Sequence, residues 1–373
     1  MLKRSLLAAA AAVALTSFAG AASAQAPAGV AVGAVEILSG PNAAYGIAIK
    51  NGLELALDTI NAGSKRIALT VEDSAGDKNQ AINAARKLIG STKVVTIIGP
   101  TLSGEMFAVG PVTNERKIPT VGTSTTADGI TAMGEYIFRT SLPEADVIPV
   151  TMKKAQAKFG TKTIALIYAN DDAFSKSGFE NMKKAAEAAG LKIVTIETFG
   201  SKDTDFSAQL TKIKGLKPDA IGVSALVEPV SGVLLQARQL GFGKETLFIG
   251  GNGANSPKLG AIAGAAADGL IVGSPWFIGK ADKANQDFVA AYKKKYNSDP
   301  DQFAAQAFDT MFIVDEAIKR AGAADPEKIR AALLQTKYSG VMGPFSFTTG
   351  RDPADTSGVV VLEMRGGKFD ILQ

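Results

Sequence analysis

The chain has 373 residues, enough for two domains, and its 46% hydrophobic residues, 20% charged residues and 39 glycines are typical of a compact α/β protein with many turns. It contains neither cysteine nor histidine, which excludes disulfides, thiolate chemistry, the Ser-His-Asp triad and the commonest zinc ligands. Catalysis by carboxylates or lysine stays open, so the composition disfavours an enzyme without excluding one.

Residues 1–24 are predicted to be a cleavable signal peptide. They have a basic start at Lys3 and Arg4, an apolar run and the small-residue cleavage site ASA (22–24). We therefore expect export, with a mature chain that begins near Gln25 and diffuses in the periplasm. Without the two early basic residues, 38 basic and 36 acidic residues remain. They are scattered, so no basic stripe for nucleic acid is expected.

From Val30 the sequence alternates strand-like and helix-like segments. The predicted strands of the first half are VAVGAVEIL (30–38), RIALTVED (66–73), VVTII (94–98) and KIPTVG (117–122). The predicted helices between them are residues 45–61, NQAINAARKLI (79–89) and EMFAVGPVTNE (105–115), the last one broken near Pro111. Strands that alternate with helices predict a parallel sheet.

The alternation restarts after Pro143 and predicts a second sheet. Its strands are TIALIYAN (163–170), LKIVTIETF (191–199), DAIGVSA (219–225) and TLFIGG (246–251), with helices at 177–190, 206–215 and 230–241. The tail departs from this order, with three helices (284–296, 303–321, 326–335) before the short β-like pieces GPFSF and GVVVLEM. We therefore predict two doubly wound units joined around residues 139–145. The tail is expected to add helices to the first unit and to finish on the second.

The turns after the predicted strands contain the candidate site residues, because open parallel sheets bind ligands outside the carboxyl ends of their strands. In the first unit these turns are SGPNAAYG (39–46), PTLSGE (100–105) and TSTTADG (123–129), and in the second NDDAF (170–174), ALVEP (225–229) and GNGANS (251–256). Hydroxyl groups and glycines dominate the first set. The second set carries carboxylates, an amide and one aromatic ring.

A hydroxyl-rich turn that opens a helix offers an anion free N–H groups, O–H donors and the positive helix end. Ser103 and the run from Thr123 to Thr126 are together predicted to hold one carboxylate. Ser103 taken alone favours ordinary helix capping. Two such turns at neighbouring strand ends shift the interpretation towards a ligand.

Other motifs indicate less. GNGANS lacks the third glycine of a dinucleotide fingerprint, and GFGKET lacks the first glycine and the hydroxyl residue of a phosphate loop. The adjacent carboxylates of Asp171 and Asp172 favour a solvated turn over a cation site. Trp276, the only tryptophan, is either a residue of a crossover at the cleft or part of the core.

The signal peptide and several segments in this order resemble the leucine/isoleucine/valine-binding protein family. The segments are SGPNAAYGIAIKNGLELALDTINA, VEDSAGDKNQAINAARKLI, PTLSG, TSTTADGIT, YIFRT, LLQARQLG and VMGPFSF. These proteins are periplasmic substrate-binding proteins of ABC importers for hydrophobic amino acids and amides. The resemblance implies the type I periplasmic binding protein fold, an α/β fold of two doubly wound parallel-sheet lobes joined by three crossovers. Lobe 1 would comprise residues 28–141 and 275–341, and lobe 2 residues 142–274 and 342–373.

The resemblance also implies roles for individual residues. Ser103 and Thr126 would bind the ligand carboxylate, and the Ser124 carbonyl would face an α-amino group. Tyr45 would line the pocket from lobe 1, and Phe174 from lobe 2. The implied partners are a small-molecule ligand and the membrane permease of an ABC importer. The resemblance implies a monomer with no metal and no cofactor.

Two positions depart from the family pattern. The acidic residue that neutralises the α-ammonium group falls on Asn252, and a second aromatic position falls on Leu226. Glu228, Asp171 or Asp172 could supply the missing charge, so an amino acid stays possible. The pattern also suits an amine-free carboxylate, such as an aromatic or aliphatic acid, or a neutral amide. A sensory subunit and an exported hydrolase remain as further alternatives.

Overall fold

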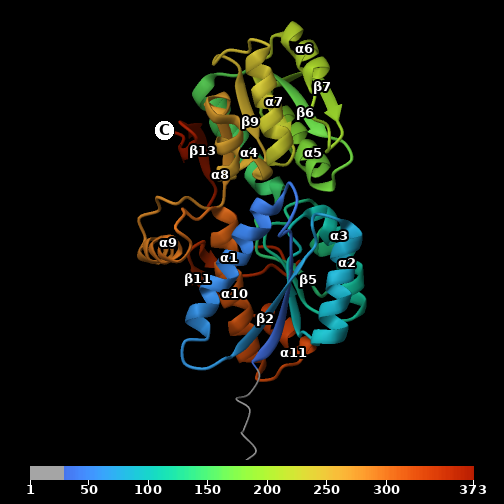
Figure 1. Cartoon of the computed structure of the whole chain (residues 1–373). Coiled ribbons are helices and arrows are strands. Elements are labelled where there is room, and N and C mark those ends of the chain that lie inside the picture. Colours follow the sequence, from blue (N-terminus) through green and yellow to red (C-terminus); the bar gives the residue numbers. More distant parts are fainter. Residues whose placement is uncertain (1–28) are drawn as a thin grey trace, which may run out of the picture.

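The computed structural model describes residues 29–373 and shows two α/β lobes, one above the other in Figure 1. The predicted signal peptide lies outside the described residues. The chain passes between the lobes after β5, after β10 and between β12 and β13. The predicted fold of two doubly wound lobes joined by three crossovers is therefore confirmed.

Lobe 1 is built on a parallel sheet in the order β2-β1-β3-β4-β5. Its strands are β1 (Val30–Glu36), β2 (Ile67–Asp73), β3 (Thr96–Ile98), β4 (Thr120–Gly122) and β5 (Ile137–Arg139). Its helices are α1 (Ala43–Ile60), α2 (Lys78–Lys87), α3 (Ser103–Glu115), α9 (Lys283–Tyr296), α10 (Gln302–Ala321) and α11 (Pro326–Leu333). The hairpin β11 (Tyr338–Gly340) and β12 (Gly343–Phe345) follows them.

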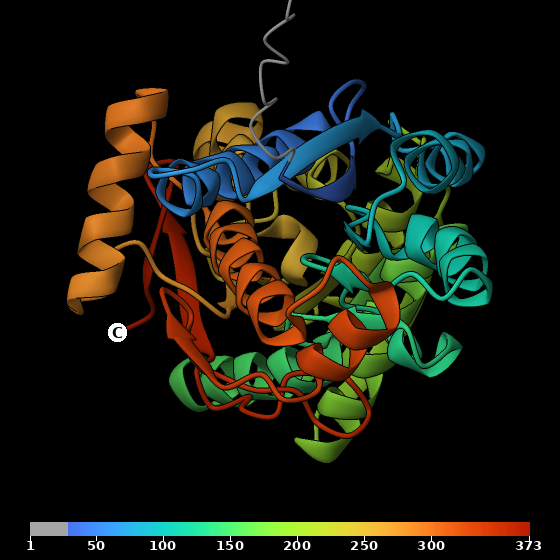
Figure 2. The ribbon, with the colours of Figure 1, turned by 90° about the horizontal axis from the view of Figure 1, so that it is seen from below.

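The alternation of side chains along β1 explains why helices cover both faces of this sheet. Val32 and Ala34 belong to the core that contains α1 and α10, whereas Val35 belongs to the core that contains α2 and α3. In Figure 2, α10 runs beside α1 and α9 lies at the edge of the lobe. Gly52 of α1 permits this close packing, since a β-carbon there would lie 2.2 Å from the carbonyl oxygen of Ala304.

Lobe 2 contains a seven-stranded sheet in the order β14-β13-β10-β9-β8-β6-β7. Its parallel strands are β6 (Thr163–Ala169), β7 (Lys192–Phe199), β8 (Ala220–Ser224), β9 (Leu247–Gly250) and β10 (Leu270–Ser274), and β13 (Val360–Arg365) and β14 (Lys368–Ile371) are antiparallel. One face carries α4 (Glu144–Phe159) and α5 (Ala173–Ala188). The other carries α6 (Ser207–Leu216), α7 (Val227–Gln239) and α8 (Pro257–Ala263).

The predicted break near Pro111 is wrong, because α3 continues through this residue to Glu115. Proline removes one helical hydrogen bond, but Met106 and Val109 are fully buried and hold the helix against the sheet. Packing therefore outweighs the local cost. Trp276 is buried in the main core, at 4% exposure, and its indole N–H donates to Asn285 Oδ1 at 2.7 Å.

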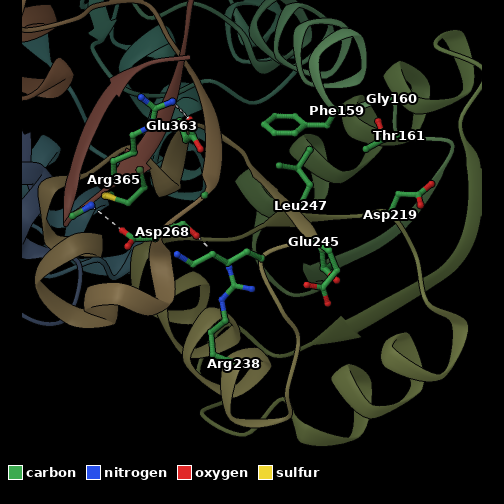
Figure 3. A pocket seen from close by; sticks show the side chains of 15 residues that line it. Phe159, Gly160, Thr161, Asp219, Arg238, Glu245, Leu247, Asp268, Glu363 and Arg365 are labelled. Atoms are coloured by element: carbon green, nitrogen blue, oxygen red, sulfur yellow. Dashed lines mark hydrogen bonds and ion pairs between the residues drawn. The ribbon is translucent and has the colours of Figure 1, made fainter. Parts of the chain in front are cut away.

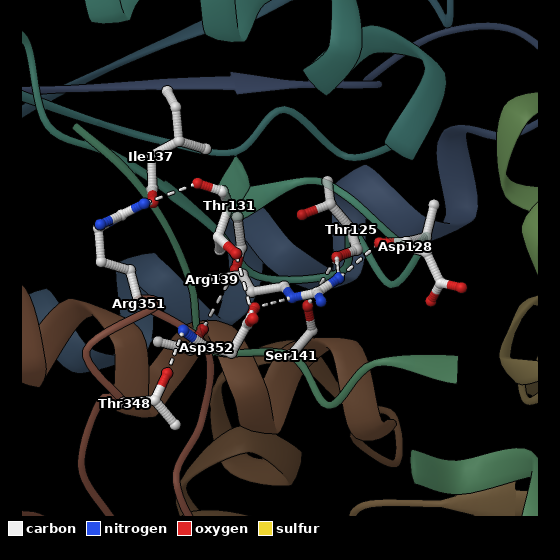
Figure 4. Close-up of polar contacts among 12 residues, drawn as sticks. Thr125, Asp128, Thr131, Ile137, Arg139, Ser141, Thr348, Arg351 and Asp352 are labelled. Carbon is white, nitrogen blue, oxygen red and sulfur yellow. Dashed lines mark hydrogen bonds and ion pairs between the residues drawn. The ribbon is translucent and has the colours of Figure 1, made fainter. Parts of the chain in front are cut away.

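A buried arginine ties the first crossover to the third (Figure 4). Arg139 Nε lies 2.5 Å from Asp352 Oδ1, and Nη1 donates to the carbonyl oxygens of Thr125 and Ala127 at 3.2 and 2.7 Å. Phe347 packs edge-on against Phe138 with ring centroids 5.2 Å apart. The chain thus stays on lobe 1 beyond residue 341, and we propose that its final return to lobe 2 begins near residue 354.

Within residues 29–373, no helix is long and apolar enough to span a bilayer.

Candidate functional site

A small cavity lies between the lobes at the carboxyl ends of strands from both sheets. The residues that line it are Tyr45, Thr101, Leu102, Ser103, Ser124, Phe174, Leu226, Asn252, Gly253 and Phe303. Its volume is about 20 Å³, which is room for roughly one water molecule. A ligand of amino-acid size therefore needs the lobes to part or the lining side chains to move.

Six of the seven predicted site residues line this cavity, namely Tyr45, Ser103, Ser124, Phe174, Leu226 and Asn252. They come from turns after six different strands. The expectation that ligands bind outside the carboxyl ends of the strands thus identified neighbouring residues that are up to 207 positions apart in the chain. Thr126 does not line the cavity, and that any of these residues binds a ligand stays a prediction.

Hydroxyl groups line the side of the cavity that lobe 1 provides. Thr101 Oγ1 donates to the buried Glu36 at 2.6 Å, and Ser124 Oγ donates to the Thr101 carbonyl at 2.6 Å. Ser103 begins α3, and its Oγ accepts from the backbone N–H of Ala127 at 3.3 Å. The proton of Ser103 has no acceptor among the described residues. Together with the N–H groups of the first turn of α3, it forms a donor set that suits an anion.

Thr126 lies just behind this donor set. It is 1% exposed, and its Oγ1 has no hydrogen-bond partner within residues 29–373. Its carbonyl oxygen accepts from the backbone N–H of Glu144, at the start of lobe 2. A buried hydroxyl without a partner costs free energy, so this group is a candidate for contact with a ligand once the lobes rearrange.

Thr126→Val should separate ligand binding from stability. We expect the affinity for a carboxylate ligand to fall about tenfold, because a hydrogen bond to a charged group contributes roughly 1.5 kcal/mol. Without ligand, the free energy of unfolding should stay equal or rise slightly, since an unpaired buried hydroxyl is removed. Calorimetry and urea unfolding measure the two quantities. The exposed Thr349→Val is the matched control, and an unchanged affinity would remove Thr126 from the site.

Aromatic rings line the rest of the cavity. Tyr45 and Phe303 contact each other edge to face, with ring centroids 5.0 Å apart. Phe174, at the start of α5, lies against Gly253, where an added β-carbon would be 2.9 Å from the ring. The aromatic side therefore suits an apolar ligand body.

Tyr45 also joins the two lobes directly. Its hydroxyl donates to the Gly253 carbonyl at 2.5 Å and accepts from the backbone N–H of Val227 at 2.8 Å. Burial raises the pKa of Tyr45 well above its usual value, so the hydroxyl keeps the proton that it donates. These bonds stabilise the closed arrangement of the lobes.

Asn252 closes the lobe 2 side of the cavity. Its backbone N–H donates to Glu144 Oε1 at 2.7 Å, and its Oδ1 lies 2.7 Å from Gln302 Nε2. The three carboxylates proposed from the sequence as partners of an ammonium group do not line the cavity. Each has another partner: Glu228 pairs with Lys258, Asp171 accepts from Ser201, and Asp172 caps α5. Among residues 29–373, none of the side chains that line the cavity is therefore ionised.

Glu144 supports Asn252 from behind and is fully buried. Burial raises the pKa of Glu144 to about 7, a change that the N–H of Asn252 opposes and the charge of Asp128 reinforces. A carboxyl group with a raised pKa binds its proton more tightly in the folded state. Its contribution to stability is therefore complete below its usual pKa and is lost as the pH rises towards 7.

Glu144→Gln should remove this pH dependence. The amide oxygen still accepts from Asn252, but the side chain no longer ionises. We expect the unfolding free energy of the variant, relative to that of wild type, to rise by about 2.5 kcal/mol from pH 5 to pH 8. Urea unfolding of both proteins at the two pH values measures the difference, and the other buried carboxyl groups cancel in the comparison. If the two proteins differed in unfolding free energy by the same amount at both pH values, the proposed titration of Glu144 would be wrong.

A larger hollow of about 460 Å³ lies in lobe 2 and contains none of the predicted residues (Figure 3). It lies at the amino ends of the strands, beside Asp219 before β8 and Leu247 at the start of β9. Ligands of open parallel sheets bind at the opposite ends. Arg238 is also already bound to backbone carbonyls, among them Gly243 at 2.6 Å and Asp268 at 3.2 Å. The cavity between the lobes is therefore the better candidate.

The sequence did not identify four residues that line the cavity. Thr101, Leu102 and Gly253 lie in turns that the sequence predicted to form the site, but the sequence did not distinguish them within those turns. Phe303 follows no strand, because it lies in the first turn of α10. Only the crossover that returns the chain to lobe 1 carries this ring to the cavity.

The chain matches the sequence profile described as periplasmic binding protein over residues 29–368. It is 30% identical to a Leu/Ile/Val-binding protein of Rhizobium johnstonii over 83% of this chain and 84% of that protein. A branched-chain amino acid transporter substrate-binding protein of Streptococcus pneumoniae, solved with isoleucine, has a TM-score of 0.84 and 29% identity over 92% of this chain and 98% of its own. A solute-binding protein of an ABC transporter from R. palustris, solved with benzoate, has a TM-score of 0.84 and 26% identity over 92% of this chain and 95% of its own.

Proposed function

Because the chain belongs to the periplasmic binding protein family, we propose that it captures a small carboxylate-bearing ligand between its lobes and delivers it to the permease of an ABC importer. A hydrophobic amino acid is the first candidate. The observation that carries this proposal is the cavity itself, in which hydroxyl donors from lobe 1 face aromatic rings and an amide from both lobes. The proposed ligand-binding residues are Tyr45, Ser103, Ser124, Thr126, Phe174, Leu226 and Asn252.

The protein acts in the periplasm as a monomer that binds and releases its ligand unchanged. The family membership supports this role. The absence of histidine from the sequence and of ionised side chains from the cavity supports binding rather than catalysis.

An amine-free ligand, such as an aromatic acid, is the second candidate. Asn252 stands where the resemblance places an acidic residue, and a neutral amide does not compensate the charge of an ammonium group. The structural relative solved with benzoate shows that this fold also holds aromatic carboxylates. The carboxylate side of the cavity is the same for both candidates.

A thermal-shift screen of amino acids, amides and aromatic acids tests the proposal. A compound present at about 100 times its dissociation constant stabilises the folded protein by about 2.7 kcal/mol, which raises the melting temperature by several degrees. The rise in melting temperature caused by the ligand should be smaller in Thr126→Val and unchanged in Thr349→Val. If no compound of the three classes shifts the melting temperature, the proposal fails. Repeated turnover of added amides or esters would instead support an exported hydrolase.

A further inference from the structure

A row of three side-chain amides leads from the cavity towards the second crossover, which follows β10. Gln302, the first residue of α10, lies between two asparagines of lobe 2. Its Nε2 is 2.7 Å from Asn252 Oδ1, and its Oε1 is 2.9 Å from Asn255 Nδ2. All three side chains are buried. Only Asn252 lines the cavity, so it is the end of the row that meets a ligand.

The row can run in two directions. A side-chain amide that turns by 180° exchanges its oxygen and its nitrogen at the same two positions. In the first direction, Asn255 donates to Gln302 and Gln302 donates to Asn252, so that the N–H₂ of Asn252 remains for the cavity. In the reverse direction, Asn252 donates to Gln302, and its Oδ1 remains for the cavity. The direction therefore decides whether the site offers a donor or an acceptor.

The hydroxyl of Ser274 distinguishes the two directions. This fully buried side chain lies at the end of β10, with its Oγ 2.5 Å from the carbonyl oxygen of Trp276 and 3.2 Å from the backbone nitrogen of Trp276. The Gln302 atom that also faces Asn255 lies 3.2 Å from the same Oγ. Since a carbonyl oxygen can only accept, the single hydroxyl proton goes to Trp276. Ser274 Oγ then offers only lone pairs to Gln302.

An amide oxygen of Gln302 at that position would face these lone pairs without a proton between them. An amide nitrogen there donates one proton to Ser274 and the other to Asn255, and all the hydrogen-bonding atoms involved find partners. Gln302 then accepts from Asn252. The proton count thus favours the reverse direction.

We infer that Ser274 and Gln302 hold the Asn252 amide with its Oδ1 towards the cavity, and that the ligand places an ammonium group there. The inference rests on the proposed function and narrows its ligand to the zwitterion of an apolar amino acid. The Ser103 hydroxyl and the N–H groups of the first turn of α3 bind the carboxylate, and the amide oxygen accepts from the ammonium group. Asn252 contacts the ligand, whereas Gln302 and Ser274 are positioning residues.

Calorimetry with leucine and 4-methylpentanoate, which lacks only the amino group, measures the choice between the two ligand types. We expect wild type to bind leucine at least tenfold more tightly. Asn255→Asp leaves an acceptor where Gln302 donates, so the ratio of the two affinities should stay within about threefold of wild type. Ser274→Ala removes the residue that sets the direction, so the ratio should fall several-fold towards one. Both residues lie outside the cavity, and a merely structural role would weaken both ligands alike.

The opposite result is equally clear. If wild type prefers 4-methylpentanoate, and Asn255→Asp reverses this preference by more than tenfold, the row runs in the first direction and the inference is wrong. If neither this pair nor phenylalanine and 3-phenylpropanoate bind, the proposed function fails instead. Neutron diffraction from deuterated crystals then determines the direction alone. Two deuterons are expected on the Gln302 atom that faces Ser274, and deuterons on the atom that faces Asn252 would overturn the inference.

Discussion

Asn252→Asp is expected to raise the affinity for leucine relative to 4-methylpentanoate by a further tenfold or more. A close, partly desolvated pair between a carboxylate and an ammonium group contributes on the order of 1–3 kcal/mol beyond a neutral hydrogen bond. The des-amino acid offers no cation, so the new carboxylate should weaken its binding. In this variant, one carboxylate oxygen takes the position of the Asn252 side-chain atom that lies 2.7 Å from Gln302. Gln302 can turn its amide so that Nε2 donates to that oxygen.

Calorimetry of wild type and Asn252→Asp with both ligands gives the ratio directly. Asn255→Asp introduces the same charge outside the cavity and controls for long-range electrostatics. An unchanged ratio in Asn252→Asp would show that Asn252 does not face the ligand. A loss of leucine binding together with a lower unfolding free energy would instead show that the 3-10 turn at Asn252–Ala254 had changed.

The two parallel-sheet lobes were predictable, although not the order of their strands, because most strands are short apolar runs between helices with one apolar face. Helix α4 was not predicted, although it has sixteen residues. It follows Pro143 and contains Pro149, and both residues indicate a boundary when they are considered locally. Strands β5 and β10 were also missed as elements, because three and five residues give too little periodicity.

The candidate site was predictable to the extent that strand ends determine it. The rule places Ser103, Phe174 and Asn252 near one another without knowledge of any side-chain contact. It does not reach Phe303, which a helix of the tail brings to the cavity, or Gln302, which the same helix places against Asn252. It also could not reveal that Glu228 is paired with Lys258, because the two lie 30 positions apart on α7 and α8.

The last prediction concerns the closed arrangement of the lobes. Tyr45→Phe should shift the unliganded protein towards an open form, because the change removes both hydrogen bonds of the Tyr45 hydroxyl. In the closed form, the buried N–H of Val227 and the carbonyl of Gly253 would each lose a partner. Two such losses cost about 2–4 kcal/mol, so the ratio of closed to open molecules should fall by roughly thirtyfold or more.

The absence of cysteine makes this equilibrium measurable, since two introduced cysteines accept a fluorescent donor and acceptor without competition. Asn83 on α2 and Lys184 on α5 are exposed and lie on different lobes. Energy transfer should be lower in Tyr45→Phe than in the parent protein. Tyr292→Phe is the matched control, because it removes a buried hydroxyl that accepts a hydrogen bond from Asn51 within lobe 1. Equal transfer efficiencies in the two variants would show that Tyr45 does not hold the lobes together. The contacts of Arg139 between the first and third crossovers would then have to stabilise closure without it.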